Sequence, residues 1–196
     1  MKIQTFILST LLAGVLCFEA CVIPAWVNTA ESDAQVAIPI AASLVDVIDP
    51  ALAPVVTLIE NGFIALSKAL DTYKADLQAN SPNTATDLRA VQAAFEAVNT
   101  NVAQLESAAQ IKDPASQSTV TAVVALLTQA VTEIAALMPA TAAGARVAEV
   151  ESVKAQVRGQ PKGWKAKDFK KAFNAIAKND LRLKGHMFKL SWRERL

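Results

Sequence analysis

The sequence predicts an all-α protein: an antiparallel up-down bundle of three long helices, with a kinked N-terminal helix and a short basic amphipathic helix near the C-terminus. The composition is 53% hydrophobic with only 6 glycines, and mostly Ala, Val and Leu make up the surplus, which favours long, closely packed helices. Between Leu52 and Met138, apolar residues recur in alternating steps of four and three, the spacing that keeps one side of a helix against its neighbours. Only short breaks divide this stretch, so consecutive helices are expected to run antiparallel.

An export segment is predicted at the N-terminus. The chain opens with a positive charge, and residues 3–18 form an uncharged, largely apolar run of 16 residues. Ala20 then precedes Cys21, and this arrangement resembles a bacterial lipoprotein signal, in which a thiol after a small residue is lipidated and becomes the mature N-terminus. The resemblance implies Cys21 as the lipid attachment site, although Phe18 and Glu19 depart from the usual pattern. Cleavage elsewhere and an uncleaved anchor are the alternatives.

The first helix of the folded part is predicted over residues 31–48. Thr29 or Ser32 is suited to cap its start, and Asp33 favours the positive end of the helix dipole. Pro39 interrupts the stretch, so we expect a kink or a division there. One side of this helix carries the apolar residues Val36, Ile40, Leu44 and Val47.

Two long helices follow, one over about residues 50–79 and one after the polar turn 80–83. Asp49 and Pro50 form a start signal, because Asp caps free N–H groups and Pro is tolerated at the first helical position. The predicted apolar seams are Leu52, Val56, Ile59, Phe63, Leu66, Leu70, Tyr73 and Leu77 in the first helix, and Leu88, Val91, Phe95, Val98, Val102, Leu105 and Ala109 in the second.

The third long helix is predicted over residues 114–138, with Asp113 as its cap. Its seam is Val120, Val124, Leu127, Val131, Ile134 and Met138, and a second apolar face is formed by Val123, Leu126, Ala130 and Leu137. Two apolar faces are typical of the central helix of a water-soluble bundle. The alternative is membrane insertion, because residues 114–132 form an uncharged run of 19 residues, near the roughly 20 needed to span a bilayer. The six Ser or Thr and two Gln in this run make spanning the weaker interpretation.

Charge divides the chain into an acidic body and a basic tail. Residues 1–153 carry 6 Lys or Arg against 15 Asp or Glu, whereas residues 154–196 carry 13 against 3. A weaker helix is predicted over residues 145–157. We expect three parts, which are an export signal or anchor over 1–21, the bundle over 29–158, and a linker with a basic amphipathic tail over 159–196.

The basic tail holds the candidate binding residues, which are Trp164, Lys165, Lys167, Phe169, Lys170, Lys171, Phe173 and Lys178. Helical spacing places Phe169, Phe173 and Ile176 on one face, with lysines beside and opposite them. This mix suits an anionic membrane surface, where aromatic rings settle at the headgroups and lysines meet lipid phosphates. Nucleic acid is an alternative that the export segment disfavours. The other alternative is docking on the acidic body of the chain or on a protein partner.

The sequence holds no recognisable catalytic or cofactor motif. There is no phosphate-binding glycine loop, no nucleophile elbow, no pair of histidines four residues apart and no calcium loop. Both cysteines lie in the first 21 residues and His186 is the single histidine, which excludes a zinc site built on Cys or on paired His residues in the body. We expect no enzymatic activity, no cofactor, no metal and no small-molecule substrate.

These observations favour an exported, membrane-tethered helical bundle on the periplasmic or outer side of a cell envelope. We expect it to act as a scaffold or binding module, with the membrane surface as its partner and with a protein partner or self-association as further options. The competing hypothesis is a membrane-active protein of phage or toxin type, acting in lysis, DNA delivery or pore formation. In that case helix 114–138 would leave the bundle and enter lipid.

Overall fold

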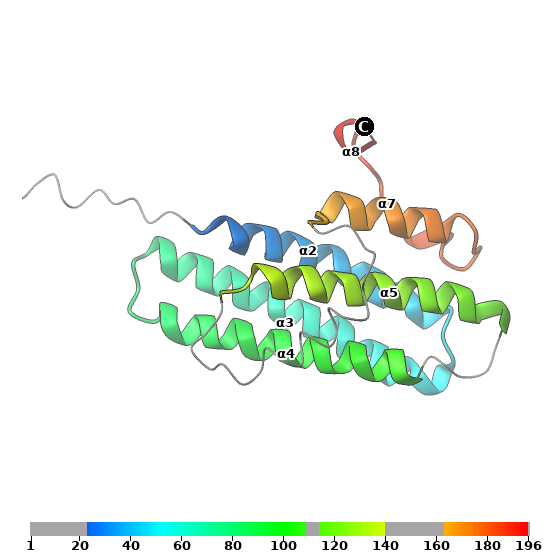
Figure 1. The fold of residues 1–196 in the computed structure, drawn as a ribbon, viewed down its shortest axis with the longest axis horizontal. Helices are drawn as coiled ribbons and strands as arrows, with labels where there is room; N and C mark the ends of the chain where they lie inside the picture. The colour runs from blue at the N-terminus through cyan, green and yellow to red at the C-terminus, as the bar shows by residue number, and fades with distance from the viewer. Residues whose placement is uncertain (1–22, 109–113, 140–162, 196) are drawn as a thin grey trace, which may run out of the picture.

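The computed structural model describes residues 23–108, 114–139 and 163–195. Over these residues the chain forms helices, turns and connections without a β-strand, so the predicted all-α bundle is confirmed (Figure 1). The predicted export segment 1–21, with Cys21, lies outside the described residues, as does the weaker helix predicted over 145–157.

Helices α3 (Ala53–Gln78), α4 (Thr84–Ala108) and α5 (Pro114–Leu137) are the three long helices that the sequence predicts. In Figure 1 the chain reverses its direction between α3 and α4 and again between α4 and α5. The turn 79–83 is too short to return along a helix of this length. Within it Asn80 adopts a left-handed φ of 50°, a conformation that Asn tolerates at the end of a helix.

The apolar seams of α3 and α4 form the centre of the bundle. The buried seam residues are Val56, Ile59, Phe63, Leu66, Leu70 and Tyr73 in α3 and Val91, Phe95, Val98, Val102 and Leu105 in α4. Leu77 and Leu88 flank the turn between the two helices and are only partly buried. Each large side chain that is fully buried contributes about 1.5–3 kcal/mol before the entropy of ordering is subtracted. The 4-3 periodicity of the sequence therefore identifies this core correctly.

Helix α2 (Ala25–Ser43) begins six residues before the predicted start. The expected caps Thr29 and Ser32 lie inside the helix, and no side chain caps its start, so this prediction was wrong. The Thr29 hydroxyl instead donates to the carbonyl of Ala25 at 3.1 Å. Near the start of α2 the ring of Trp26 packs on Tyr73 of α3, with centroids 5.8 Å apart. This contact accompanies the earlier start of the helix.

The connection between α2 and α3 consists of two single turns. Pro39 lies inside α2 without ending it, and the 3-10 turn η1 (Leu44–Asp46) follows the helix. A second 3-10 turn, η2 (Pro50–Leu52), leads into α3. The amide of Ala51 donates to Oδ1 of Asp49 at 2.9 Å, so the predicted capping role of Asp49 is confirmed.

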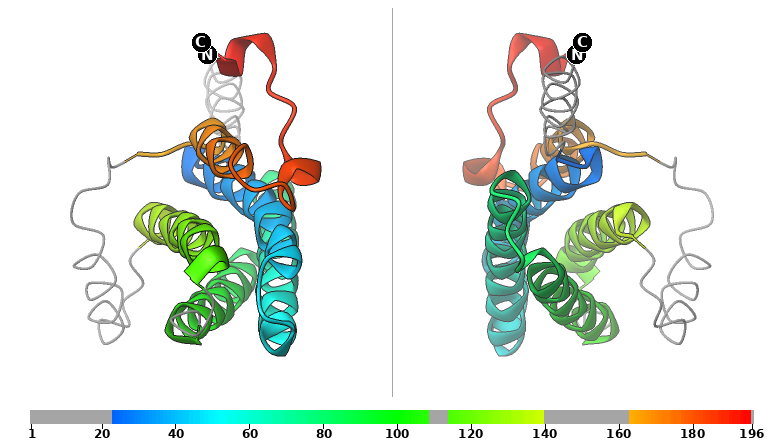
Figure 2. Two further views of the ribbon diagram at one scale, coloured as in Figure 1. Left: turned by 90° about the vertical axis from the view of Figure 1, so that its right-hand side faces the viewer. Right: turned by 90° about the vertical axis from the view of Figure 1, so that its left-hand side faces the viewer.

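Helix α5 contacts α2, α4 and α7 and is buried on two sides (Figure 2). Its buried apolar residues are Val120, Val123, Val124, Leu126, Leu127, Ala130, Val131 and Ile134. These residues come from both the seam and the second apolar face. The second face is therefore covered by neighbouring helices, as expected for a central helix.

Two of the described helical stretches are long and apolar enough to cross a membrane, Pro50–Gln78 and Gln117–Leu137. In Gln117–Leu137, 50% of the most apolar window is buried inside the bundle, compared with 22% in Pro50–Gln78. Length and hydropathy are weak evidence for spanning, because the core helix of a water-soluble protein has the same properties.

The C-terminal segment, defined here as residues 163–195, packs on the bundle. Helix α7 (Ala166–Ala177) lies against α2 and α5, and the predicted basic amphipathic helix is therefore present (Figures 1 and 2). The chain then forms a 3-10 turn, η3 (Lys184–His186), returns past α7 and ends in the short helix α8 (Trp192–Arg195). From this segment Phe169, Phe173, Ala177 and Leu183 are buried in the same core as α2 to α5.

Candidate functional site

The aromatic residues predicted from the sequence to bind a partner point toward the bundle. Phe169 and Phe173 are fully buried, and the half-buried Trp164 ring lies 5.2 Å from that of Phe169. A membrane or nucleic-acid partner would require these rings on the outside, whereas docking on the body of the chain, the other alternative, places them where the structure has them. In the docked conformation Phe169 and Phe173 cannot contact lipid or nucleic acid, because α2 and α5 cover them. Burial of apolar rings in a nearby protein core is favourable in free energy, because it removes apolar surface from water.

The nominated lysines lie at or near the surface. Lys165, Lys167 and Lys178 are exposed, and Lys170 and Lys171 are half-buried. Steps of four and seven residues separate Lys167, Lys171 and Lys178, so these three side chains share one face of α7. Further along the segment Arg182, Lys184 and Lys189 are exposed as well. The structure thus separates the cations, on the outside, from the phenylalanines, on the inside.

The three acidic side chains of the C-terminal segment are already engaged. Asp168 accepts from the amide of Lys165 at 3.0 Å, as the third residue of α7. Asp180 forms a 2.7 Å ion pair with Arg182, and Glu194 forms a 2.9 Å ion pair with Lys170. Residues 163–195 contain ten Lys or Arg and three Asp or Glu, which leaves an excess of seven positive charges (10 − 3 = 7).

Two large apolar side chains of the C-terminal segment are exposed among these cations. Leu181 is 79% exposed and Trp192 is 71% exposed, the highest values among the large hydrophobic residues that the structure describes. Neither was singled out from the sequence as a binding residue. A signal for Trp192 was present, because Ser191 and Glu194 have the spacing of a capping box. That box forms, with the Ser191 amide 2.8 Å from Glu194, and Trp192 becomes the first residue of α8.

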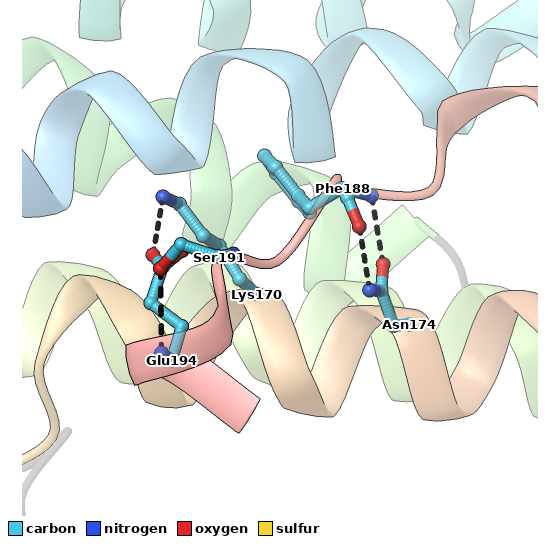
Figure 3. A network of polar contacts seen from close by, with 5 residues as sticks. All are labelled: Lys170, Asn174, Phe188, Ser191 and Glu194. Carbon is cyan, nitrogen blue, oxygen red and sulfur yellow. Dashed lines mark hydrogen bonds and ion pairs between the residues drawn. The ribbon is translucent and has the colours of Figure 1, made fainter. Parts of the chain in front are cut away.

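Polar contacts hold residues 187–191, which we call the return segment, and α8 over α7 (Figure 3). The side chain of Asn174 pairs with the backbone of Phe188, donating from Nδ2 at 2.9 Å and accepting at Oδ1 at 2.8 Å. Lys170 reaches Glu194 at 2.9 Å, and the rings of Phe173 and Phe188 meet edge to face with centroids 5.6 Å apart. These contacts fix where α8, and therefore Trp192, lies on the surface.

A second polar feature lies underneath α7, where α2, α5 and α7 meet. Asp33 of α2 is only 1% exposed, and neither of its carboxylate oxygens has a hydrogen-bond partner. Burial, together with the smaller effects of the negative charges of Glu133 in α5 and Asp168 in α7, raises the pKa of Asp33 from 3.8 to about 7. We call Asp33, Glu133 and Asp168 the acidic junction. The Ala166 amide lowers this pKa by less than burial or Glu133 raises it, although its geometry falls short of a hydrogen bond.

Glu133 links α5 to the start of the C-terminal segment. Its carboxylate accepts from Nε2 of Gln129 at 2.7 Å and from the amide of Gly163, whose nitrogen lies 3.2 Å from Oε2. Gln129 is itself buried, and its Oε1 atom lacks a partner. Sequence reasoning missed this junction, because it placed Asp33 in the first turn of a helix that begins at residue 31. The earlier start at Ala25 moves Asp33 into the interior of α2.

Among the described residues, no group of three or more His, Cys, Asp or Glu side chains is placed to hold a metal ion. His186 of η3 approaches Asp46 of η1, with Nε2 and Oδ2 2.6 Å apart, and this contact joins the C-terminal segment to the end of α2. No protein-family model, no curated protein and no solved structure matches this chain.

Proposed function

We propose that this chain is an exported, membrane-tethered helical bundle that acts without enzymatic activity as an envelope scaffold or binding module, and that the outer side of its C-terminal segment binds an anionic membrane surface. The observation that supports it most is the combination of exposed cations with exposed Leu181 and Trp192 on one segment. The proposal of a membrane tether is based on the export pattern of residues 3–18 and on the small residue before Cys21.

The physical basis is attraction between cations and anionic headgroups, reinforced by interfacial insertion of an aromatic ring. Each Lys or Arg near an anionic bilayer contributes about 1 kcal/mol, and the attraction falls off within a Debye length. Trp prefers the headgroup region, because its ring is apolar and its N–H remains hydrated there. Phe169 and Phe173 take no part in this docked form, since they belong to the core.

Co-sedimentation of the full chain with vesicles tests the surface. We expect binding to phosphatidylcholine vesicles that contain phosphatidylglycerol, little binding to pure phosphatidylcholine, and weakening by salt. The triple variant K167Q/K171Q/K178Q should bind roughly 100-fold more weakly, at about 1 kcal/mol for each lost cation. L181A/W192A should also bind more weakly at unchanged thermal stability.

A matched control removes cations from another face. Lys68 and Arg89 are exposed on α3 and α4, so K68Q/R89Q should bind like the wild type. If K68Q/R89Q and K167Q/K171Q/K178Q lost vesicle binding equally, the attraction would be nonspecific. Failure of the wild type to bind anionic vesicles, or tighter binding to a nucleic acid of similar charge, would reject the membrane surface as partner.

Processing of the N-terminus tests the tether separately. We expect mass spectrometry of the mature protein to find a lipid-modified Cys21 and cell fractionation to find the protein with membranes. Cys21→Ser should then release it from the membrane fraction. Recovery of the full-length, unprocessed chain in the soluble cytoplasm would overturn the export proposal.

A second candidate function is membrane insertion by α5, favoured by the length and apolar character of Gln117–Leu137. Leakage of dye from anionic vesicles would support it. Ala125→Lys separates insertion from folding, because Ala125 is exposed on α5 and its replacement leaves the core intact. A lysine near the bilayer centre costs about 2.5–3.5 kcal/mol, so A125K should abolish leakage that depends on α5. Absence of leakage from the wild type at micromolar protein excludes this function.

A further inference from the structure

The acidic junction is an unusual way to hold two parts of a chain together. A buried carboxylate without a hydrogen-bond partner is costly when it is charged, because it has lost water and gained nothing in exchange. Asp33 is close to this description, since it is 1% exposed and both of its oxygens lack hydrogen-bond partners, and the nearby Ala166 amide offsets only part of the cost. It lies where α7 packs on α2 and α5, so its cost falls on the docking of the C-terminal segment.

The charged groups around Asp33 increase that cost. From α5 the neighbouring charge is Glu133, and from α7 it is Asp168, both of them acidic. From α3 the charged side chain that reaches α2 is Lys74, but it pairs with Glu31 at 3.0 Å. No cation is therefore placed to neutralise Asp33 among the groups that act on it in the described structure. A neutral Asp33 fits this position and a charged one does not.

We propose that the acidic junction is a proton-responsive latch, in which the C-terminal segment stays docked on α2 and α5 while Asp33 is neutral and is released more readily once Asp33 is ionised. The residue that carries the response is Asp33, and its burial, together with the nearby acids Glu133 and Asp168, sets the pH range in which it acts.

The sign of the response follows from the two states. In the released state Asp33 is hydrated and takes its ordinary pKa of 3.8, whereas docking raises the pKa to about 7. Below about pH 4 both states hold the proton, so Asp33 does not weaken docking there. As the pH rises from about 4 to about 7, only the docked state must keep the proton, so docking weakens. Above about pH 7 Asp33 is ionised in both states, and docking does not weaken further.

Release has a structural consequence that goes beyond the proposed membrane surface. It would uncover the aromatic face of α7, formed by Phe169 and Phe173, beside the lysine face that is already exposed. Such a basic amphipathic helix is suited to lie in a membrane interface. This last step rests on the proposed function, whereas the latch itself does not, and it can be tested without any membrane.

Hydrogen exchange of the full chain in solution is the test. The protection of α7 peptides is compared with that of α4 peptides in the same sample, which cancels the intrinsic dependence of exchange on pH. Between about pH 5 and about pH 8 we expect the protection of α7 relative to α4 to fall by roughly tenfold or more in the wild type. Asp33→Asn should remove this fall, because an amide of the same shape stays neutral throughout.

Two further variants sharpen the test. Glu133→Gln keeps an acceptor for Gly163 but removes a negative charge, so it should move the midpoint of the transition to lower pH. Asp71→Asn changes an exposed carboxyl on α3 and should behave like the wild type. The latch is rejected if relative protection of α7 in the wild type does not change with pH, or if D33N retains the change. If the wild type binds anionic vesicles but shows no pH response in exchange, the latch is rejected and the proposed membrane surface is retained.

Discussion

The side-chain amide of Asn174 pairs with the backbone of Phe188 through two hydrogen bonds, of 2.9 Å from Nδ2 to O and 2.8 Å from N to Oδ1. One side chain thus satisfies both the backbone donor and the backbone acceptor of Phe188, as a neighbouring β-strand would. Asn174 is only 8% exposed, so water cannot readily replace it. This pairing is the principal polar attachment of the return segment, residues 187–191, to α7 (Figure 3).

Asn174→Ala should release the return segment and α8 while α7 stays docked. The variant leaves the N–H and the carbonyl of Phe188 without their partner, which costs about 1–3 kcal/mol for a group that is out of water. We expect faster trypsin cleavage after Lys189 and faster amide exchange over residues 187–192. Asn179→Ala is the matched control, because Asn179 is exposed and its side-chain amide donates only to the carbonyl of Ala175 in α7, and it should leave both readouts unchanged.

Phe173→Ala should destabilise the whole bundle, because the ring is fully buried in the core shared by α2, α5 and α7. Truncation of a buried Phe costs about 3–5 kcal/mol. Leu181→Ala removes an apolar side chain of the same segment that is 79% exposed, and it should change the free energy of unfolding by no more than about 0.5 kcal/mol. Urea unfolding measures both. Equal stabilities for F173A and the wild type would show that the C-terminal segment is an independent tail.

Gly62→Ala should destabilise the protein, although alanine normally stabilises a helix interior by about 1 kcal/mol relative to glycine. A Cβ atom at Gly62 would lie 2.9 Å from Cγ2 of Val98, at the contact between α3 and α4. Val98 is buried and its β-branched side chain has little freedom to turn away. Overpacking of this kind costs about 1–3 kcal/mol, so we expect a net loss of about 1 kcal/mol in urea unfolding.

A double-mutant cycle locates the cause of that loss. Val98→Ala makes room for the new methyl group, so the double variant G62A/V98A should be less destabilised than the sum of the two single variants by about 1 kcal/mol. Gly185→Ala is the control, because no atom lies within 4 Å of the added Cβ. Stabilisation by G62A would mean that α3 and α4 are farther apart than described.

The helices of the bundle were predictable because their signals are local. The seam of α3 and α4 needs only a 4-3 step in the sequence, and residues such as Phe63 and Val98 are buried as that step requires. The cap at Asp49 also depends on adjacent residues alone. The start of α2 was not predictable in this way, because no side chain caps it and Trp26 finds its partner Tyr73 on another helix.

The arrangement of the candidate site depended on contacts that periodicity does not encode. The amphipathic pattern of α7 identified Phe169 and Phe173 as one face, but it could not show whether a membrane or the bundle covers that face. Likewise, Asp33 becomes a buried acid only when α7 and α5 pack over it. Exposure of Trp192 follows from the short capped helix α8 and from its attachment to α7, which is again a tertiary feature.

Glu194 should make the attachment of α8 sensitive to acid. The hydrogen bond from Lys170, together with those from Ser191, lowers the pKa of Glu194 from 4.5 to about 2. Its contribution to the attachment is therefore present above about pH 4.5 and is lost as the pH falls from 4.5 to about 2. The amide proton of Ser191, 2.8 Å from the Glu194 carboxylate, reports this directly by NMR and should titrate with a midpoint near 2. Lys170→Met should raise that midpoint toward 4.5.

The two acids act on the C-terminal segment with opposite signs, and together they predict an optimum. Ionisation of Asp33 weakens the docking of α7 as the pH rises above about 4, whereas protonation of Glu194 weakens the attachment of α8 below about 4.5. The segment should therefore be held most firmly near pH 4–5, where Glu194 is still charged and Asp33 is neutral in the docked state. D33N should extend this range upward in pH without changing its lower limit, because the two groups lie in different contacts of the segment. E194Q should remove the contribution of Glu194 to the lower limit and leave the response above pH 4.5 unchanged. A variant that moved both limits together would show that one titrating group, and not two, controls the segment.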